Sequence, residues 1–135
     1  RKAVASIQKL HEEFQAQAEF FVVYIKEAHP EDEWQMSVNE RQGVVFRQPK
    51  TYEERQKIAN LMIEKFKMKV PTLIDKMDNH VEVCYAAWPE RYYLIGKDGK
   101  VVYKGKPGPG GFRPKEFRSY LSERYRVQSQ AGETE

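Results

Sequence analysis

Three polar residues close together in the sequence, Tyr24, Glu27 and His29, could transfer protons in a reaction. They lie at or just beyond the end of the apolar run 20–25, which predicts a strand buried on both faces. Open α/β sheets place ligands and catalytic groups at the carboxyl ends of their strands. A histidine titrates near neutral pH, and a carboxylate two residues away can fix its tautomer or share its proton. The alternative is a surface hydrogen bond between Glu27 and His29 without a catalytic role.

Arg91 and Pro71 are candidates for substrate binding, and each has a structural alternative. Arg91 begins an otherwise apolar predicted strand, where its guanidinium could bind a carboxylate or a phenolate. It could equally pair with Glu90 or Asp75. Pro71 enters a predicted strand within a Val-Pro-Thr sequence. That context favours a cis Val-Pro bond over a trans proline at a strand start.

Cys84 is the one thiol of the chain, so no internal disulfide can form. Within a short predicted helix, its apolar neighbours favour a small buried hydrophobic residue over a nucleophile or a resolving thiol. Three scattered histidines with one cysteine do not form a metal-ligand pattern, so we expect no metal.

The elements that would position these residues follow from hydrophobic spacing and turn signals. Between the first strand and Lys50 no periodicity persists, so residues 26–50 are predicted to form a site-forming insertion loop. A capping box at Thr51 and Glu54 predicts a helix start. The expected elements are a helix over 1–17, strands at 20–25 and 70–75, helices from 51 and over 78–87, a hairpin over 91–104 turning at Asp98-Gly99, and a final helix from Pro114.

The length of 135 residues suits one domain, which we place over residues 1–126 and follow with a polar tail over 127–135. The net charge of +3 is too small to indicate nucleic-acid binding. The longest apolar run is far shorter than a membrane-spanning helix requires. We therefore expect a soluble, cytoplasmic protein without nucleic-acid or membrane partners.

The order of elements is α/β and resembles a thioredoxin-like fold, with a central mixed sheet flanked by helices. In that fold a strand and a turn bearing the redox nucleophile precede the first helix, where backbone N–H groups lower a thiol pKa. The first strand and the nucleophile turn are therefore expected upstream of Arg1.

The run from Tyr24 to Pro30, with Trp34 shortly after, resembles the iodothyronine deiodinases. Further similar segments follow in the same order, and the likeness covers almost the whole chain. They are Glu53-Glu54-Arg55, Leu73-Ile74-Asp75-Lys76-Met77, Tyr85-Ala86-Ala87, Pro89 to Ile95, and Tyr103 to Pro109. The hairpin from Ile95 to Tyr103 also looks like many peroxiredoxins and thioredoxin-like proteins, so it supports the fold and not the activity.

The resemblance implies reductive removal of iodide from an iodinated phenol by a selenocysteine or cysteine, with regeneration by a thiol co-substrate. His29 would contact the phenolic oxygen and handle protons, Glu27 would support it, and Tyr24 would line the site. Arg91 would hold the other end of the substrate, with Pro71 and Trp34 as further substrate-binding residues.

The missing nucleophile and membrane anchor indicate a catalytic-domain fragment of a soluble relative, such as a bacterial one. Pro49 stands where the animal enzymes place a histidine. A peroxiredoxin-like thiol reductase or peroxidase, with another thiol-redox substrate, and a non-catalytic thioredoxin-like binding domain remain alternatives. Neither enzyme reading requires a bound organic cofactor, so none is expected. The expected partners are the small-molecule substrate and a reducing thiol or thioredoxin-like protein. A homodimer remains open.

Overall fold

The computed structural model describes residues 2–28 and 47–132, which form two compact units. Unit 2 comprises the described residues of 21–90, and unit 1 combines residues 2–20 with 91–132. Each unit has its own strand pair and its own helices. The assignment of one domain over 1–126 stays a prediction.

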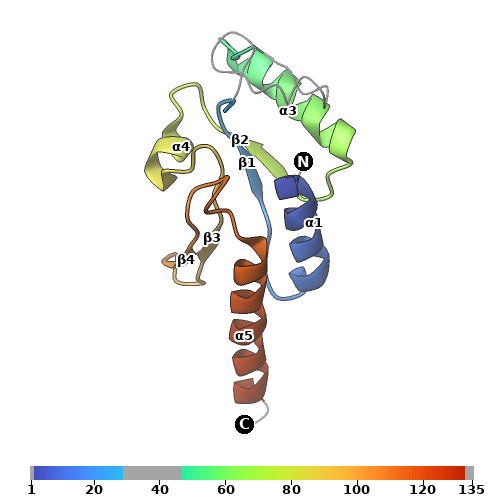
Figure 1. Ribbon diagram of the computed structural model, residues 1–135, viewed down its shortest axis with the longest axis vertical. Coiled ribbons are helices and arrows are strands. Elements are labelled where there is room, and N and C mark those ends of the chain that lie inside the picture. The colour runs from blue at the N-terminus through green and yellow to red at the C-terminus, as the bar shows by residue number, and fades with distance from the viewer. Residues whose placement is uncertain (1, 29–46, 133–135) are drawn as a thin grey trace. The chain divides into compact units, whose positions relative to one another are not determined.

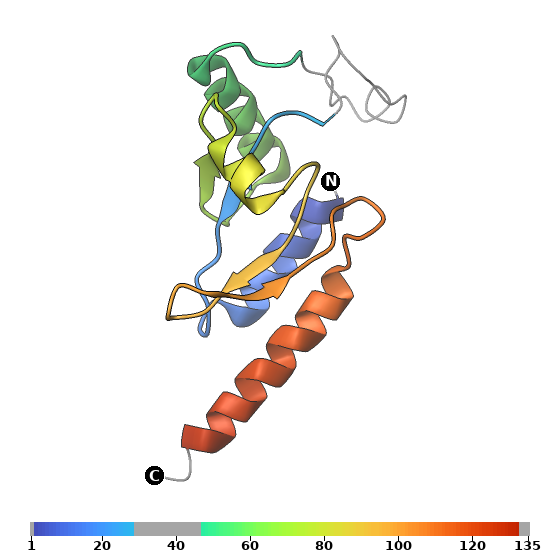
Figure 2. The same ribbon diagram turned by 90° about the vertical axis from the view of Figure 1, so that its left-hand side faces the viewer.

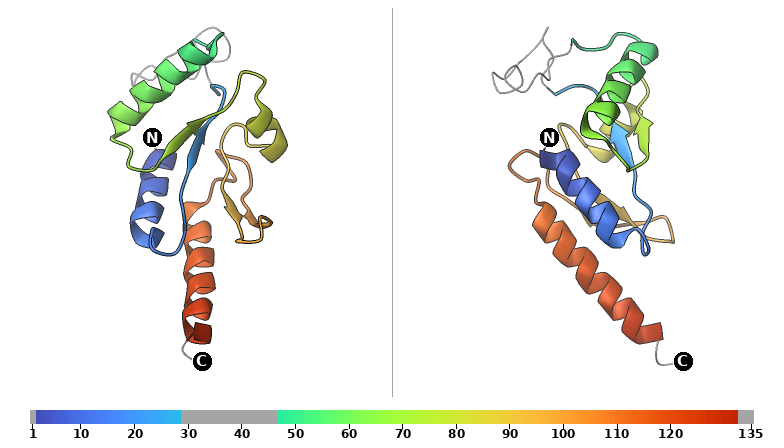
Figure 3. Two further views of the ribbon diagram at one scale, coloured as in Figure 1. Left: turned by 180° about the vertical axis from the view of Figure 1, so that it is seen from behind. Right: turned by 90° about the vertical axis from the view of Figure 1, so that its right-hand side faces the viewer.

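Unit 2 is built on two parallel strands, β1 (Val22–Tyr24) and β2 (Thr72–Ile74) (Figure 1). The ladder continues past both ends, because Val22 N–H donates to the Pro71 carbonyl and Asp75 N–H to the Tyr24 carbonyl, each at 2.9 Å. Helix α3 (Tyr52–Phe66) packs against β2, as the views in Figure 3 show. The short helix α4 (His80–Tyr85) follows β2. The carboxyl ends of β1 and β2 therefore meet at one edge.

The predicted cis bond at Pro71 is wrong. The Val70–Pro71 bond is trans, and Pro71 lies directly before β2, where the ring removes no ladder donor and its carbonyl still accepts from Val22. Cis bonds occur instead at Trp88–Pro89 and Gly108–Pro109.

The first strand is also less buried than expected. Val23 and its cross-strand partner Leu73 are 36% and 52% exposed, whereas their neighbours on the opposite face are half-buried. Alternate residues of a strand point to opposite faces, and α3 packs on one of them. Within unit 2, β1 and β2 thus have one covered and one open face.

Unit 1 contains α1 (Lys2–Phe14), β3 (Tyr93–Ile95), β4 (Val101–Lys104) and α5 (Pro114–Gly132). The antiparallel β3–β4 hairpin turns through Gly99, whose φ of 78° favours glycine, and it lies beside α5 (Figure 2). Helices α1 and α5 lie side by side (Figure 3), and Arg118 donates to both carboxylate oxygens of Glu13 at 2.7 and 2.6 Å. The buried apolar side chains of this unit are Leu10, Phe14, Phe20, Phe117 and Leu121.

These elements confirm the α/β class and the order expected from the sequence. Among the described residues, the strands form two separate two-stranded sheets, so the central mixed sheet and the thioredoxin-like arrangement stay predictions. Helix α5 continues past Arg126 to Gly132, where a polar tail was expected, because residues 127–131 contain neither proline nor glycine.

The capping box at the start of α3 predicts a specific loss of stability. Thr51 Oγ1 accepts from Glu54 N–H at 3.2 Å, and Glu54 Oε2 accepts from the N–H groups of Thr51 and Lys50 at 3.4 and 2.7 Å. Thr51→Ala should lower the free energy of unfolding in urea by about 1 kcal/mol, whereas Thr51→Ser should retain most of it. Equal losses in both variants would show that the hydroxyl does not cap the helix.

Candidate active site

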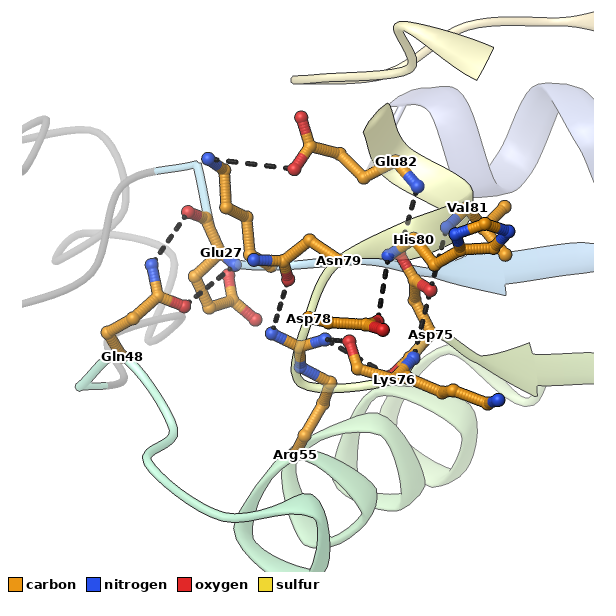
Figure 4. Close-up of polar contacts among 11 residues, drawn as sticks. Glu27, Gln48, Arg55, Asp75, Lys76, Asp78, Asn79, His80, Val81 and Glu82 are labelled. Carbon is orange, nitrogen blue, oxygen red and sulfur yellow. Dashed lines mark hydrogen bonds and ion pairs between the residues drawn. The ribbon is translucent and has the colours of Figure 1, made fainter. Parts of the chain in front are cut away.

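The candidate site is a cavity of about 340 Å³ in unit 2, beyond the carboxyl ends of β1 and β2. The segment after β1 provides Glu27, α3 provides Arg55, and the turn after β2 provides Asn79 (Figure 4). The other lining residues are Lys26, Ala28, Gln48, Pro49, Met77 and Trp88. The cavity thus forms at the carboxyl ends of β1 and β2, where the sequence predicts catalytic residues.

Gln48 holds the backbone of Glu27 by two hydrogen bonds. Its Oε1 accepts from Glu27 N–H at 3.1 Å, and its Nε2 donates to the Glu27 carbonyl at 3.2 Å. The side-chain amide thereby satisfies both backbone groups of a residue beyond the end of β1. Gln48 was not identified from the sequence, because nothing in a lone glutamine 21 positions away predicts this pairing.

Arg55 fixes the turn that follows β2 from the buried side of α3. Its guanidinium donates through Nη1 to the carbonyls of Asp75 and Lys76 at 3.1 and 2.6 Å, and through Nη2 to Asn79 Oδ1 at 2.8 Å. The residue is only 2% exposed. In the sequence Arg55 stands out only as part of a helix start, so its role in the site was missed.

Asp75 fixes the same turn from the strand side. Its buried carboxylate accepts from the N–H groups of Lys76, Val81 and Glu82 at 2.9, 3.0 and 2.9 Å. Two of these donors lie in the first turn of α4, whose N–H groups have no partner within the helix. The Asp75 carboxylate therefore holds the start of α4 against the end of β2.

Burial raises the pKa of Glu27 from 4.5 to about 7, and the positive charge of Arg55 opposes this rise. Lys26 is directed to other groups: its ammonium lies 3.6 Å from Glu82 Oε2 and 6.0 Å from the centre of the Trp88 ring. A carboxyl group with a pKa near 7 can both give and take a proton at neutral pH. Glu27 thus has the titration behaviour of a general acid or base.

Tyr24 ends β1 with its hydroxyl buried. Within the described part of the chain, this Oη has no hydrogen-bond partner, although its backbone carbonyl is paired with Asp75. An unpaired buried hydroxyl costs free energy unless something else binds it. Tyr24 does not belong to the residues that line the Glu27 cavity, so its predicted place in the site stays a prediction.

Arg91 belongs to unit 1, and its guanidinium is held weakly. Its Nη1 lies 3.5 Å from Tyr93 Oη, and its buried Nε has no partner within residues 2–28 and 47–132. Glu90 and Asp75, the two structural partners considered for Arg91, belong to unit 2, so neither pairing is tested and both stay predictions. The buried Nε of Arg91 retains a donor for an anionic group.

The described structure does not show His29, Trp34 or Pro71 together with Glu27. His29 and Trp34 lie outside the described residues. Pro71 lies at the opposite end of β2 from the Glu27 cavity and does not line it. Glu27 and Arg91 belong to different units, so a single cleft shared by His29, Glu27 and Arg91 stays a prediction.

Cys84 is exposed, so the expectation of a small buried residue is wrong. Its Sγ lies 3.7 and 3.9 Å from the two ring nitrogens of His80, one helical turn earlier. Residues four apart share one face of a helix, and here that face points outward. Apolar sequence neighbours did not predict burial, because Val83 is itself 67% exposed.

The described residues contain no group of three or more His, Cys, Asp or Glu side chains that could hold a metal ion. The prediction of a metal-free, cofactor-free site stays a prediction. Within the described chain no helix combines the length and apolar character needed to cross a membrane.

Together, the α/β fold and a buried acid in a polar cavity define a domain with a candidate acid–base site. A family model described as iodothyronine deiodinase matches residues 2–126, and the chain therefore belongs to the iodothyronine deiodinase family. This confirms the family resemblance found in the sequence.

Curated relatives show the same similarity. The chain is 35% identical over 121 residues to a type I iodothyronine deiodinase of Xenopus laevis, covering 90% of this chain and 46% of the relative. It is 38% identical over 128 residues to a thyroxine 5-deiodinase of Sparus aurata, with 91% and 44% covered. A type II iodothyronine deiodinase of Rattus norvegicus is 29% identical over 126 residues, with 92% and 47% covered. The chain thus spans less than half the length of these relatives.

The raised pKa of Glu27 predicts how stability depends on pH. An acid whose pKa is higher in the folded state binds more protons when folded, so stability falls as pH rises from about 4.5 to 7. Above that window the full loss is on the order of 3 kcal/mol, because each pH unit by which the folded-state pKa exceeds the unfolded-state pKa corresponds to about 1.4 kcal/mol. Glu27→Gln should remove this loss.

The measurement compares free energies of unfolding for the unsubstituted protein and Glu27→Gln at pH 4.5 and pH 8. The variant should gain stability relative to the parent as pH rises. A difference that does not change between the two pH values would contradict the raised pKa.

Proposed function

We propose that this chain is the catalytic-domain portion of an oxidoreductase that removes iodide reductively from an iodinated phenol. The reaction replaces a carbon–iodine bond by a carbon–hydrogen bond and releases iodide. It consumes one proton and two electrons. Two thiol groups of the co-substrate supply two electrons and two protons and become a disulfide. One proton replaces iodide on the carbon and the other is released, and a proton-transferring group of the protein would deliver the first.

The observation that carries the proposal is the position of the half-buried Glu27 carboxyl in the cavity beyond the strand ends, where desolvation raises its pKa to about 7. The Gln48 clamp holds its backbone, and its side chain lines a cavity large enough for part of a small aromatic molecule. A proton donor at neutral pH is what reductive deiodination requires. Membership of the deiodinase family supports the same reaction.

The other roles follow from the family resemblance and remain proposals. His29 would contact the phenolic oxygen and pass protons with Glu27, and Tyr24 would contact the substrate through its unpaired hydroxyl. Arg91 would bind the opposite, anionic end of the substrate through its unpaired donors. Trp34 would line the substrate site.

The nucleophile is proposed to be a cysteine or selenocysteine that precedes residue 1 in the intact protein. Cys84 is a poor alternative, because it lies exposed on α4 and does not line the Glu27 cavity. Pro49, which replaces the histidine expected from the animal enzymes, lines that cavity. We therefore propose a substrate class of iodinated phenols without commitment to a thyroid hormone.

Deiodination should depend strongly on Glu27 and His29. In the intact protein, Glu27→Gln and His29→Ala should each lower kcat for an iodophenol by about 10²- to 10⁴-fold, the range typical of acid–base groups. Released iodide and the deiodinated phenol are measured with a thiol reductant in excess.

Cys84→Ala is the control and should leave turnover unchanged. Full activity in both Glu27→Gln and His29→Ala would overturn their proposed proton-transfer roles, and loss of activity in Cys84→Ala with the fold intact would make Cys84 a catalytic thiol. No iodide release by the intact protein would overturn the proposed reaction. Turnover of peroxide in place of iodophenol would favour the peroxidase alternative.

Arg91 should act on binding more than on chemistry. A clamp on a remote anionic group stabilises ground and transition states similarly, so Arg91→Ala should raise KM for a carboxylate-bearing iodophenol with little change in kcat. The matched comparison is an iodophenol that lacks the carboxylate, for which the same substitution should have little effect. Equal losses for both substrates would show that Arg91 does not recognise the anionic end.

A further inference from the structure

The Glu27 carboxyl lies beside the guanidinium of Arg55 in the cavity (Figure 4). Arg55 lies 28 residues later on α3, yet both side chains line the same space. No direct hydrogen bond joins the two in the described structure, because Nη1 and Nη2 of Arg55 are directed to the turn after β2. Its Nε is buried and has no partner among the described residues.

The three hydrogen bonds keep the guanidinium in one place. They join two backbone carbonyls and Asn79, which adopts a left-handed conformation with φ 55°. An arginine side chain has many rotamers, and fixing it in a buried position requires such a set of acceptors. The positive charge is therefore localised at one wall of the cavity.

The other charged groups around Glu27 are engaged elsewhere or belong to the turn. On its own segment, Lys26 pairs with Glu82 of α4. The Asp75 carboxylate accepts from three backbone N–H groups, and Asp78 accepts from His80 N–H at 3.1 Å. The other charged and titratable groups of this turn and α4 are Lys76 and His80, which Figure 4 labels, and Cys84 and Tyr85. Arg55 is the cation whose charge acts on the Glu27 carboxyl.

We propose that Arg55 is a positioning residue for Glu27: its buried, triply bonded guanidinium forms one wall of the cavity and fixes a positive charge opposite the carboxyl. The inference rests on the proposed role of Glu27 in proton transfer. The role proposed for Arg55 is to keep that carboxyl able to ionise near neutral pH. Burial alone would keep Glu27 protonated to higher pH, so that little carboxylate would be present at neutral pH to accept a proton.

The first experiment titrates the Glu27 carboxyl carbon by NMR in protein labelled with carbon-13, with the signal assigned by its absence in Glu27→Gln. Arg55→Met should raise the titration midpoint by about one pH unit or more, the usual effect of removing a nearby opposite charge. Arg55→Lys keeps a cation, so its titration midpoint should stay closer to that of the unsubstituted protein.

Two controls separate this effect from a general loss of charge or structure. Lys57→Met removes an exposed cation from the same helix and should leave the midpoint unchanged. Lys26→Met removes the neighbouring cation and should shift it less than Arg55→Met. An unchanged midpoint in Arg55→Met, or equal shifts in the Met and Lys variants of Arg55, would overturn the inference.

The second experiment needs no substitution of Arg55, in case its loss prevents folding. The guanidinium resonances of Arg55 in the unsubstituted protein should show an inflection at the Glu27 midpoint, and Glu27→Gln should abolish it. Absence of that inflection would contradict the inference. If these titrations behave as expected but Glu27→Gln retains full deiodination, the proposed proton-transfer role of Glu27 fails and the effect of Arg55 on its titration stands.

Discussion

The hydrogen bonds from Arg55 to the turn after β2 are the interaction on which the site depends. A buried guanidinium and the buried Asp75 carboxylate, both 2% exposed, would be strongly destabilising without partners. Each is satisfied mainly by backbone groups of one short turn, with Arg55 binding its carbonyls and Asp75 binding its N–H groups. The turn is thereby held between α3 and β2, and α4 begins where its N–H groups meet the carboxylate.

The same arrangement explains why Glu27, which lies beyond the end of β1, has a raised pKa. The cavity wall removes water from Glu27, which raises its pKa, while the fixed charge of Arg55 limits the rise. Gln48 holds the Glu27 backbone from the other side. Two residues that are distant in sequence thus govern one carboxyl, and neither has to touch substrate to do so.

The sequence predicted elements well where local signals are strong. The α3 capping box and the Asp98-Gly99 turn involve residues within a few positions, so the physical cause is visible in the sequence. The position of Glu27 at a strand end also followed from the apolar run before it. The contacts of Gln48 and Arg55 span 20 or more residues, and no local pattern encodes them.

The errors have a similar origin. The expectations for Pro71 and Cys84 rest on the residues beside them, but the trans bond and the exposed thiol depend on which face and which end of an element the fold covers. For Arg91 the alternatives of ion pairing and ligand binding are both open in the sequence, and the described structure adds only that its buried Nε has no hydrogen-bond partner. Family similarity adds the reaction class, which no single contact reveals.

The central claim is that Glu27 exchanges its proton near neutral pH within this cavity. The most direct test is the carbon-13 NMR titration of the Glu27 carboxyl in the unsubstituted protein. We expect a midpoint of about 7. A midpoint at the ordinary glutamate value near 4.5 would show that the carboxyl is solvated and would remove it as the proton donor.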